Sequence, residues 1–92
     1  MKVKDLLTDE SKWTQNVNAR TEDGSPCEPK STNATQWCLF GALCKCYKDH
    51  NEFTDMVHRI QKHTGHDPIT TWNDVKHRTF ADVSAIITAL NI

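Results

Sequence analysis

The feature that most constrains the fold is one long apolar run, residues 36–44 (QWCLFGALC), in an otherwise polar chain. At 3.6 residues per turn, its apolar side chains cover most of the circumference of a helix. Such a helix must be surrounded by other elements, so we expect a buried central helix over about residues 35–48. Gly41 costs a helix interior about 1 kcal/mol relative to alanine, which indicates the close approach of a neighbouring backbone.

The length of 92 residues predicts a single domain over residues 1–92. The charges nearly cancel, with 11 basic and 12 acidic side chains, so a nucleic-acid partner is not expected. The N-terminal segment has no apolar signal region and no run is long enough for a membrane span. We therefore expect a cytoplasmic protein with no membrane partner, whose four cysteines are reduced thiols.

Before the central helix, the patterns change twice. Residues 3–12 carry the apolar stripe of a short helix, and residues 13–20 alternate in the manner of an extended strand. A loop follows, in which Asp23-Gly24 marks a turn. An extended pair on either side of that turn is a candidate β-hairpin near residues 13–30, and Ser31, Thr32 or Asn33 is the expected cap of the central helix.

After the central helix, residues 52–64 form an amphipathic pattern that ends at Gly65, where a C-terminal glycine belongs. A single helical turn is expected over 72–76. Thr79 and Asp82 have nearly the spacing of a capping box and predict the start of a last helix. The fold class is thus mainly α: a compact domain of three to five helices around the central one, with a candidate hairpin. We expect one contiguous core made by Trp37, Phe40, Leu43, Phe53, Met56, Ile60, Val83, Ile87 and Leu90.

Cys38 stands at the start of the apolar helix, where Cys–His hydrolases place a nucleophile whose pKa the helix N-terminus lowers. A base would have to come from one of the five histidines: His50, His58, His63, His66 or His77. Cysteine is also among the most buried residue types and packs as a small apolar side chain. We favour core packing for Cys38 and expect no catalytic residue.

A metal site is the other reading of the cysteines. Cys44 and Cys46 lie about 200° apart on a helix, so the two thiols and His50 do not easily face one ion. The cysteine spacings fit no paired zinc pattern. The cluster His63 to Asp67 reads equally well as a polar helix end. We expect neither a metal nor a cofactor.

Five sequence blocks resemble a small uncharacterised bacterial and phage domain family, a domain of unknown function. They are W-x-Q from Trp13, D-G-x-P from Asp23, W-C-L-x-G-A-L from Trp37, W-N-D from Trp72 and R-T-x-x-D-V from Arg78. Asn16 stands where the resemblance has glycine after Gln15. The resemblance implies no activity, cofactor or partner; its phage and prophage occurrence implies an accessory role, for example inhibition of anti-phage defence.

Several polar residues in these blocks are not required by packing. They adjoin two tryptophans from distant segments, which would meet if the two segments pack together. The predicted binding site is therefore Trp13, Gln15, Trp72, Asn73, Asp74 and Arg78, an aromatic centre with a polar rim. We expect a non-catalytic binding protein with a protein partner; the alternatives are a small Cys–His hydrolase using Cys38 and a metal-stabilised module.

Overall fold

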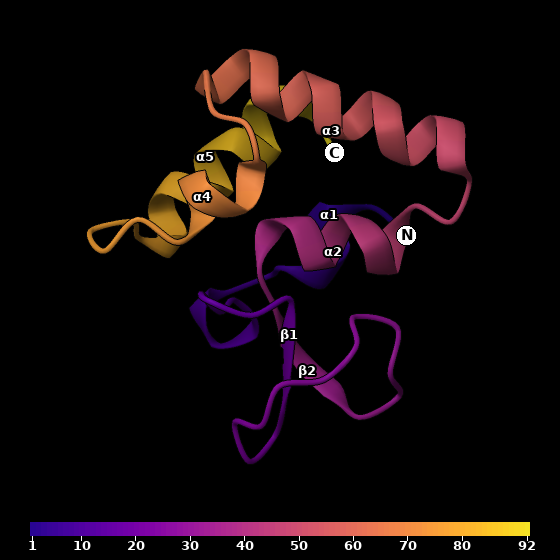
Figure 1. Ribbon diagram of the computed structural model, residues 1–92, viewed down its shortest axis with the longest axis vertical. Helices are drawn as coiled ribbons and strands as arrows, with labels where there is room; N and C mark the ends of the chain where they lie inside the picture. The colour runs from indigo at the N-terminus through magenta and orange to yellow at the C-terminus, as the bar shows by residue number, and fades with distance from the viewer.

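The computed structural model describes residues 1–92 and is mainly helical, with a two-stranded antiparallel hairpin, which confirms the expected fold class. The hairpin lies at one end of the molecule and the longest helix crosses the other end (Figure 1). No helix has the length and the apolar character that crossing a bilayer requires. The elements in chain order are α1 (Val3–Leu6), η1 (Glu10–Lys12), β1 (Ala19–Thr21), β2 (Ala34–Trp37), α2 (Leu39–Cys46), α3 (His50–Thr64), α4 (Ile69–Asn73) and α5 (Phe80–Leu90).

The central helix is α2, which is shorter than the predicted range 35–48. Residues 34–37 belong to β2, because they pair with β1 across the sheet. The cap is Cys38, whose Sγ accepts a hydrogen bond from the Gly41 amide at 3.2 Å, and not one of residues 31–33. An apolar run alone does not distinguish a buried strand from a buried helix. The prediction that the helix begins near residue 35 was therefore wrong, whereas the prediction that the central helix is buried is confirmed.

Gly41 has the close neighbour that its position predicted. A β-carbon built on it would lie 2.0 Å from the carbonyl oxygen of Asn18. That same oxygen accepts a hydrogen bond from the Cys38 amide at 3.1 Å. The segment before β1 thus lies directly on the N-terminal turn of α2, where only glycine leaves room for it.

The hairpin differs from the predicted one. β1 pairs with β2, with Ala19 opposite Trp37 and Arg20 opposite Gln36. A tight turn does occur at Asp23-Gly24, but the bridge across it joins only Arg20 to Pro26. The extended strand predicted over 13–20 is interrupted because Asn16 has a φ of 72°, in the left-handed region.

The predicted first helix over 3–12 is divided into α1 and η1. Asp9 separates them, because its carboxylate accepts from the Ser11 amide at 2.9 Å and caps η1. α3 begins slightly before the predicted range, since Asp49 is its cap, and ends at Gly65 with a φ of 74° as predicted.

The turn predicted over 72–76 is instead α4, which begins after Pro68, and Asp74 ends it. α5 begins with the expected capping box. The Thr79 amide donates to Asp82 Oδ2 at 3.0 Å, and the Asp82 amide donates to Thr79 Oγ1 at 3.3 Å.

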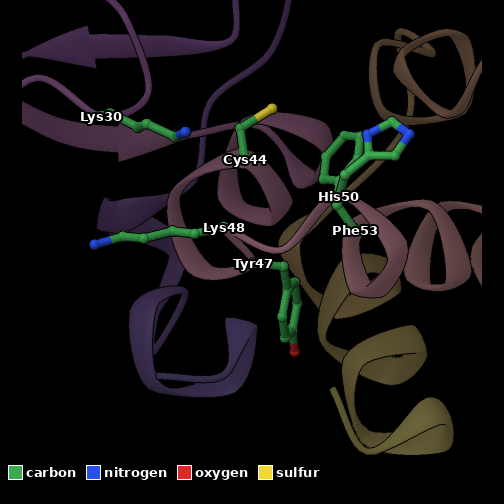
Figure 2. Close-up of a pocket in the computed structure, with 6 residues that line it drawn as sticks. All are labelled: Lys30, Cys44, Tyr47, Lys48, His50 and Phe53. Carbon is green, nitrogen blue, oxygen red and sulfur yellow. The ribbon is translucent and has the colours of Figure 1, made fainter.

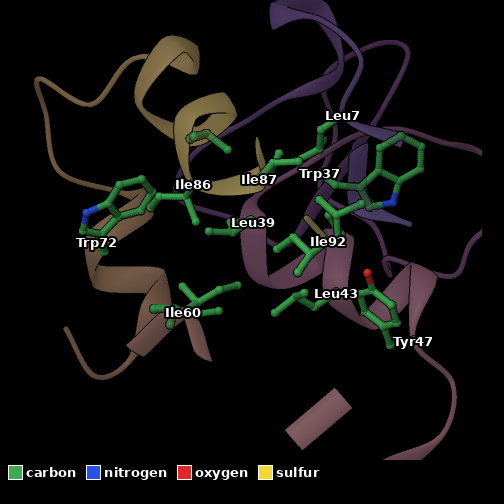
Figure 3. Close-up of a cluster of buried hydrophobic side chains, with 14 of the residues drawn as sticks. Leu7, Trp37, Leu39, Leu43, Tyr47, Ile60, Trp72, Ile86, Ile87 and Ile92 are labelled. Atoms are coloured by element: carbon green, nitrogen blue, oxygen red, sulfur yellow. The ribbon is translucent and has the colours of Figure 1, made fainter. Parts of the chain in front are cut away.

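The core surrounds α2 (Figure 3). Of the nine predicted core residues, Trp37, Leu43, Ile60, Val83 and Ile87 are buried, while Phe40, Phe53, Met56 and Leu90 are half-buried at its edge. The buried members that the prediction did not include lie in or beside α1, β1, α2, α4 and α5: Val3, Leu7, Ala19, Leu39, Ala42, Tyr47, Ile69, Trp72, Ile86 and Ile92. The Tyr47 hydroxyl is buried and has no hydrogen-bond partner.

Candidate functional site

One buried amide organises the region where the predicted binding residues lie. Asn73, at the end of α4, is fully buried. Its Oδ1 accepts from the Trp13 indole at 2.8 Å and from the Leu39 amide at 3.0 Å. Its Nδ2 donates to the Thr14 carbonyl at 3.1 Å and to Asp74 Oδ1 at 2.9 Å. All of its hydrogen-bonding capacity is used, and it joins α4, the N-terminus of α2 and the segment after η1.

The segment after η1 is held to the end of α4 by three more hydrogen bonds. Gln15 Nε2 donates to the carbonyls of Asn73 at 2.9 Å and Val75 at 3.0 Å. The Asn16 amide donates to Asp74 Oδ1 at 2.9 Å. Asn16 occupies the position where the sequence resemblance has glycine, and its left-handed backbone gives the reason, since asparagine adopts this conformation more readily than most residues.

Aromatic side chains complete the region. The Arg78 guanidinium lies 3.9 Å from the centre of the Trp72 ring, and its Nε donates to the Trp72 carbonyl at 2.9 Å. An ion pair at 3.9 Å joins Arg78 to Asp82. The ring of Trp13 packs against Phe80, with 6.4 Å between ring centres. The two tryptophans do not form the expected pair: Trp13 packs against Phe80 in the first turn of α5, and Trp72 contacts Arg78 in the segment before that helix.

The structure brings all six predicted binding residues into one region, but at different depths. Trp72 and Asn73 are buried and support it from below. The residues that reach solvent are Trp13, Gln15, Asp74 and Arg78, each half-buried. Val75 and Phe80 lie among them, and Val75 is 38% exposed. We call these six residues the Trp13 surface: Trp13, Gln15, Asp74, Val75, Arg78 and Phe80.

Val75 and Phe80 were missed as site residues. Val75 directly follows the W-N-D block, but a single apolar residue there carries no signal of exposure. Phe80 is an apolar residue in the first turn of α5, where the sequence gives no sign of a surface role. Only the tertiary contact with Trp13 shows that Phe80 also borders the surface.

Cys38 is placed as a helix cap and not as an accessible nucleophile. Its side chain is 2% exposed. Burial raises the pKa of the thiol from 9.0 to about 11, although the amides of Gly41 and Phe40 partly oppose the rise. Its only side-chain neighbour within hydrogen-bonding range is the Asn18 amide oxygen at 3.9 Å, so no histidine is paired with it. A protonated, buried thiol is poorly suited to nucleophilic attack.

The other cysteines also lack the arrangement of a metal site. All four are free thiols, and no three His, Cys, Asp or Glu side chains converge on one point, so Cys44, Cys46 and His50 do not form a ligand cluster. Burial raises the pKa of Cys46 to about 11 and also raises that of Cys44. Asp67, in the second candidate cluster, instead accepts from Gln61 Nε2 at 2.9 Å.

A hollow of about 220 Å³ lies between the end of α2 and the start of α3 (Figure 2). In this view Lys30 extends its ammonium group toward Cys44, with Phe53 and His50 on the opposite side. The remaining lining residues are Tyr47 and Lys48. Basic residues near the end of α2 are expected from the helix dipole alone, but Lys30 comes from the loop between β1 and β2, which the sequence did not place here.

Comparison with known proteins identifies a family and no characterised relative. Residues 1–90 match the family described as "Family of unknown function (DUF6197)". No curated protein and no solved structure matches the chain. Because the match covers nearly the whole sequence, the chain belongs to the DUF6197 family.

Proposed function

We propose that this protein is a small non-catalytic binding protein that acts through a protein partner. The observation that carries the proposal is the composition of the Trp13 surface. Two half-buried aromatic rings and the exposed Val75 lie among the polar groups of Gln15, Asp74 and Arg78. Protein interfaces have this anatomy, with apolar anchors at the centre and polar groups around them.

The atoms left free on this surface support the same proposal. Asp74 uses Oδ1 for two internal hydrogen bonds, whereas its Oδ2 accepts none. Gln15 donates twice through Nε2, and its Oε1 is unused. The buried Asn73 network holds both side chains in place before a partner arrives. Such preorganisation lowers the entropy cost of association.

For the biological setting, we propose a cytoplasmic accessory protein of phage or prophage, for example an inhibitor of anti-phage defence. The phage setting rests on the sequence resemblance. The cytoplasmic setting is supported by four cysteines that form no disulfide, as expected in a reducing compartment. The hydrolase alternative has less support, because Cys38 is buried and its pKa is raised.

The test needs a partner and matched surface variants. Partners are captured by chemical crosslinking in a bacterial host, identified by mass spectrometry, purified, and titrated against the protein by calorimetry. Val75→Glu is the site variant, and Ala89→Glu, at an exposed position of α5, adds the same charge elsewhere. We expect Val75→Glu to weaken binding at least about tenfold, a typical loss at an interface centre, while Ala89→Glu binds like the parent.

Asp74→Asn tests the polar rim, since it keeps Oδ1 as an acceptor and replaces the free Oδ2. A captured partner whose Kd is unchanged by both Val75→Glu and Asp74→Asn, with both variants melting like the parent, does not dock on the Trp13 surface. That result would refute the proposal.

A further inference from the structure

A second surface lies at the other end of α2, around Lys30. A hollow of about 340 Å³ is lined by five residues, of which three are lysines and none is acidic: Met1, Lys30, Lys45, Cys46 and Lys48. It shares Lys30 and Lys48 with the hollow of about 220 Å³ in Figure 2. Lys30 and Cys44 also line a third hollow of about 290 Å³, which reaches Asn18. The three hollows are neighbours around the Lys30 side chain, which lines all of them, and we call them together the lysine groove.

The three lysines of this groove form no ion pair within the chain. The protein's only ion pair joins Arg78 to Asp82, so none of the three lysines has a carboxylate partner. Lys30 is close enough to Cys44 to oppose the rise in the pKa of that thiol. Glu28, in the third hollow, is the one carboxylate among the lining residues, and it acts on the pKa of Cys44 in the opposite direction to Lys30. Like charges gathered in this way attract a complementary anionic partner and speed its association.

The arrangement of the hollows and the side chains that line them indicate which class of ligand the groove would bind. Three neighbouring hollows suit an extended chain better than a single small ion. Apolar or weakly polar side chains contribute to the hollow of about 220 Å³: Cys44, Tyr47 and Phe53. Arginine, whose planar fork grips phosphate with two hydrogen bonds, is absent from all three linings. Lysine side chains are flexible, so their ammonium groups can donate to carboxylates at varied positions.

We propose that the lysine groove binds an acidic segment of a protein, whose aspartate or glutamate carboxylates meet Lys30, Lys45 and Lys48. Apolar side chains of the same segment cover Cys44 and Phe53. Lys45 and Lys48 lie at or just after the C-terminal end of α2, whereas the Trp13 surface adjoins its N-terminal end. Asn73 binds the Leu39 amide at the first residue of that helix, whereas Cys46 is its last residue. The proposal therefore adds a second site and a partner chemistry to the function proposed above.

The experiment uses a synthetic probe and needs no natural partner. A fluorescein-labelled hexapeptide of four acidic and two apolar residues, Glu-Leu-Glu-Glu-Phe-Glu, is titrated with the protein and its anisotropy is measured at low and physiological salt. The site variant is Lys30→Gln/Lys45→Gln/Lys48→Gln. The control is Lys12→Gln/Lys62→Gln/Lys76→Gln, which removes the same charge at exposed positions elsewhere. Thermal melting verifies that both variants fold.

We expect the site variant to bind the peptide at least about tenfold more weakly than the parent, and the control to stay within about twofold. Amide NMR shifts of the parent should move at residues 44–48 on peptide addition. Equal weakening in both variants, or no binding to the parent, would overturn the proposal. Inorganic phosphate or a single-stranded oligonucleotide that binds through the same lysines more tightly than the peptide would overturn the assignment to a protein segment.

This test is independent of the Trp13 surface, which is unchanged in both lysine variants. A negative peptide result therefore removes the lysine groove as a site without affecting the outcome of the Val75→Glu comparison.

Discussion

Gly41→Ala should destabilise the protein, although the same exchange in an unobstructed helix stabilises it by about 1 kcal/mol. The added β-carbon would lie 2.0 Å from the carbonyl oxygen of Asn18 and 2.9 Å from its carbon. A carbon and an oxygen in ordinary contact are about 3.3–3.6 Å apart. The Asn18 carbonyl must therefore retreat from α2 by more than about 1 Å.

The retreat has two costs. Overpacking of this kind typically costs about 1–3 kcal/mol. The retreat also breaks the hydrogen bond that the Cys38 amide donates to the Asn18 oxygen at 3.1 Å. A buried donor that is left unpaired costs about 1–3 kcal/mol. After subtracting the helix-propensity gain of about 1 kcal/mol, the expected loss is about 1–5 kcal/mol. The total stability of a chain of this length is on the order of 5–14 kcal/mol.

Urea unfolding followed by tryptophan fluorescence measures this loss directly. A matched control is Thr88→Ala, at an exposed position of α5, which gains helix propensity without meeting a neighbour. We expect Thr88→Ala to be neutral or slightly stabilising and Gly41→Ala to have a clearly lower urea midpoint with an unchanged m-value. A Gly41→Ala variant at least as stable as the parent would show that the segment before β1 does not lie against α2.

Three further results are expected. Asn73→Ala should lower the free energy of unfolding by at least about 3 kcal/mol, because it leaves the Leu39 amide, the Trp13 indole and the Thr14 carbonyl without their partner; a loss below 1 kcal/mol in urea unfolding would contradict this. Tyr47→Phe should raise stability by about 1 kcal/mol, since it removes a buried hydroxyl that has no partner, and a lower melting temperature would speak against it. Because burial raises the pKa of Cys38 from 9.0 to about 11, folding favours the protonated thiol. Stability should thus be unaffected by this group below about pH 9 and should fall by on the order of 1–3 kcal/mol as the pH rises through the folded-state pKa; a Cys38→Ala variant with the same alkaline slope as the parent would exclude this cause.

The parts of the fold that sequence reasoning predicted correctly depend on local chemistry. The Thr79–Asp82 box and Gly65 act within one helical turn, so short spacings are enough to find them. The strand at Ala34–Trp37 was missed because it forms through a contact with a distant segment and not through a local pattern. It pairs with β1, whose residues lie about 15 positions earlier, and that pairing overrides the apolar run.

The sequence predicted that six residues cluster, but it missed Val75 and Phe80 and did not predict which of the six are buried. Adjacency to tryptophan and the shared sequence blocks correctly suggested that Gln15 and Asn73 meet. Nothing local showed that Asn73 is buried, because its partners are Leu39, 34 positions away, and Trp13, 60 positions away. The lysine groove was not predicted at all, since Lys30 reaches the end of α2 only through the path of the β1–β2 loop.

The two ends of α2 differ in how their polar groups are used, and this difference suggests different roles in binding. At the first residue of α2, the hydrogen bonds of Asn73 pair all of its side-chain polar atoms and support a rigid, partly apolar surface. Near the last residue, three lysines line the groove without forming an ion pair within the chain. Rim charges mainly affect association rate and salt dependence, whereas buried apolar anchors mainly affect dissociation. The eight residues of α2 span only about 12 Å, so one partner of ordinary interface size can cover both ends. For such a partner, the lysine variants should slow association most at low salt, while Val75→Glu should speed dissociation at any salt concentration.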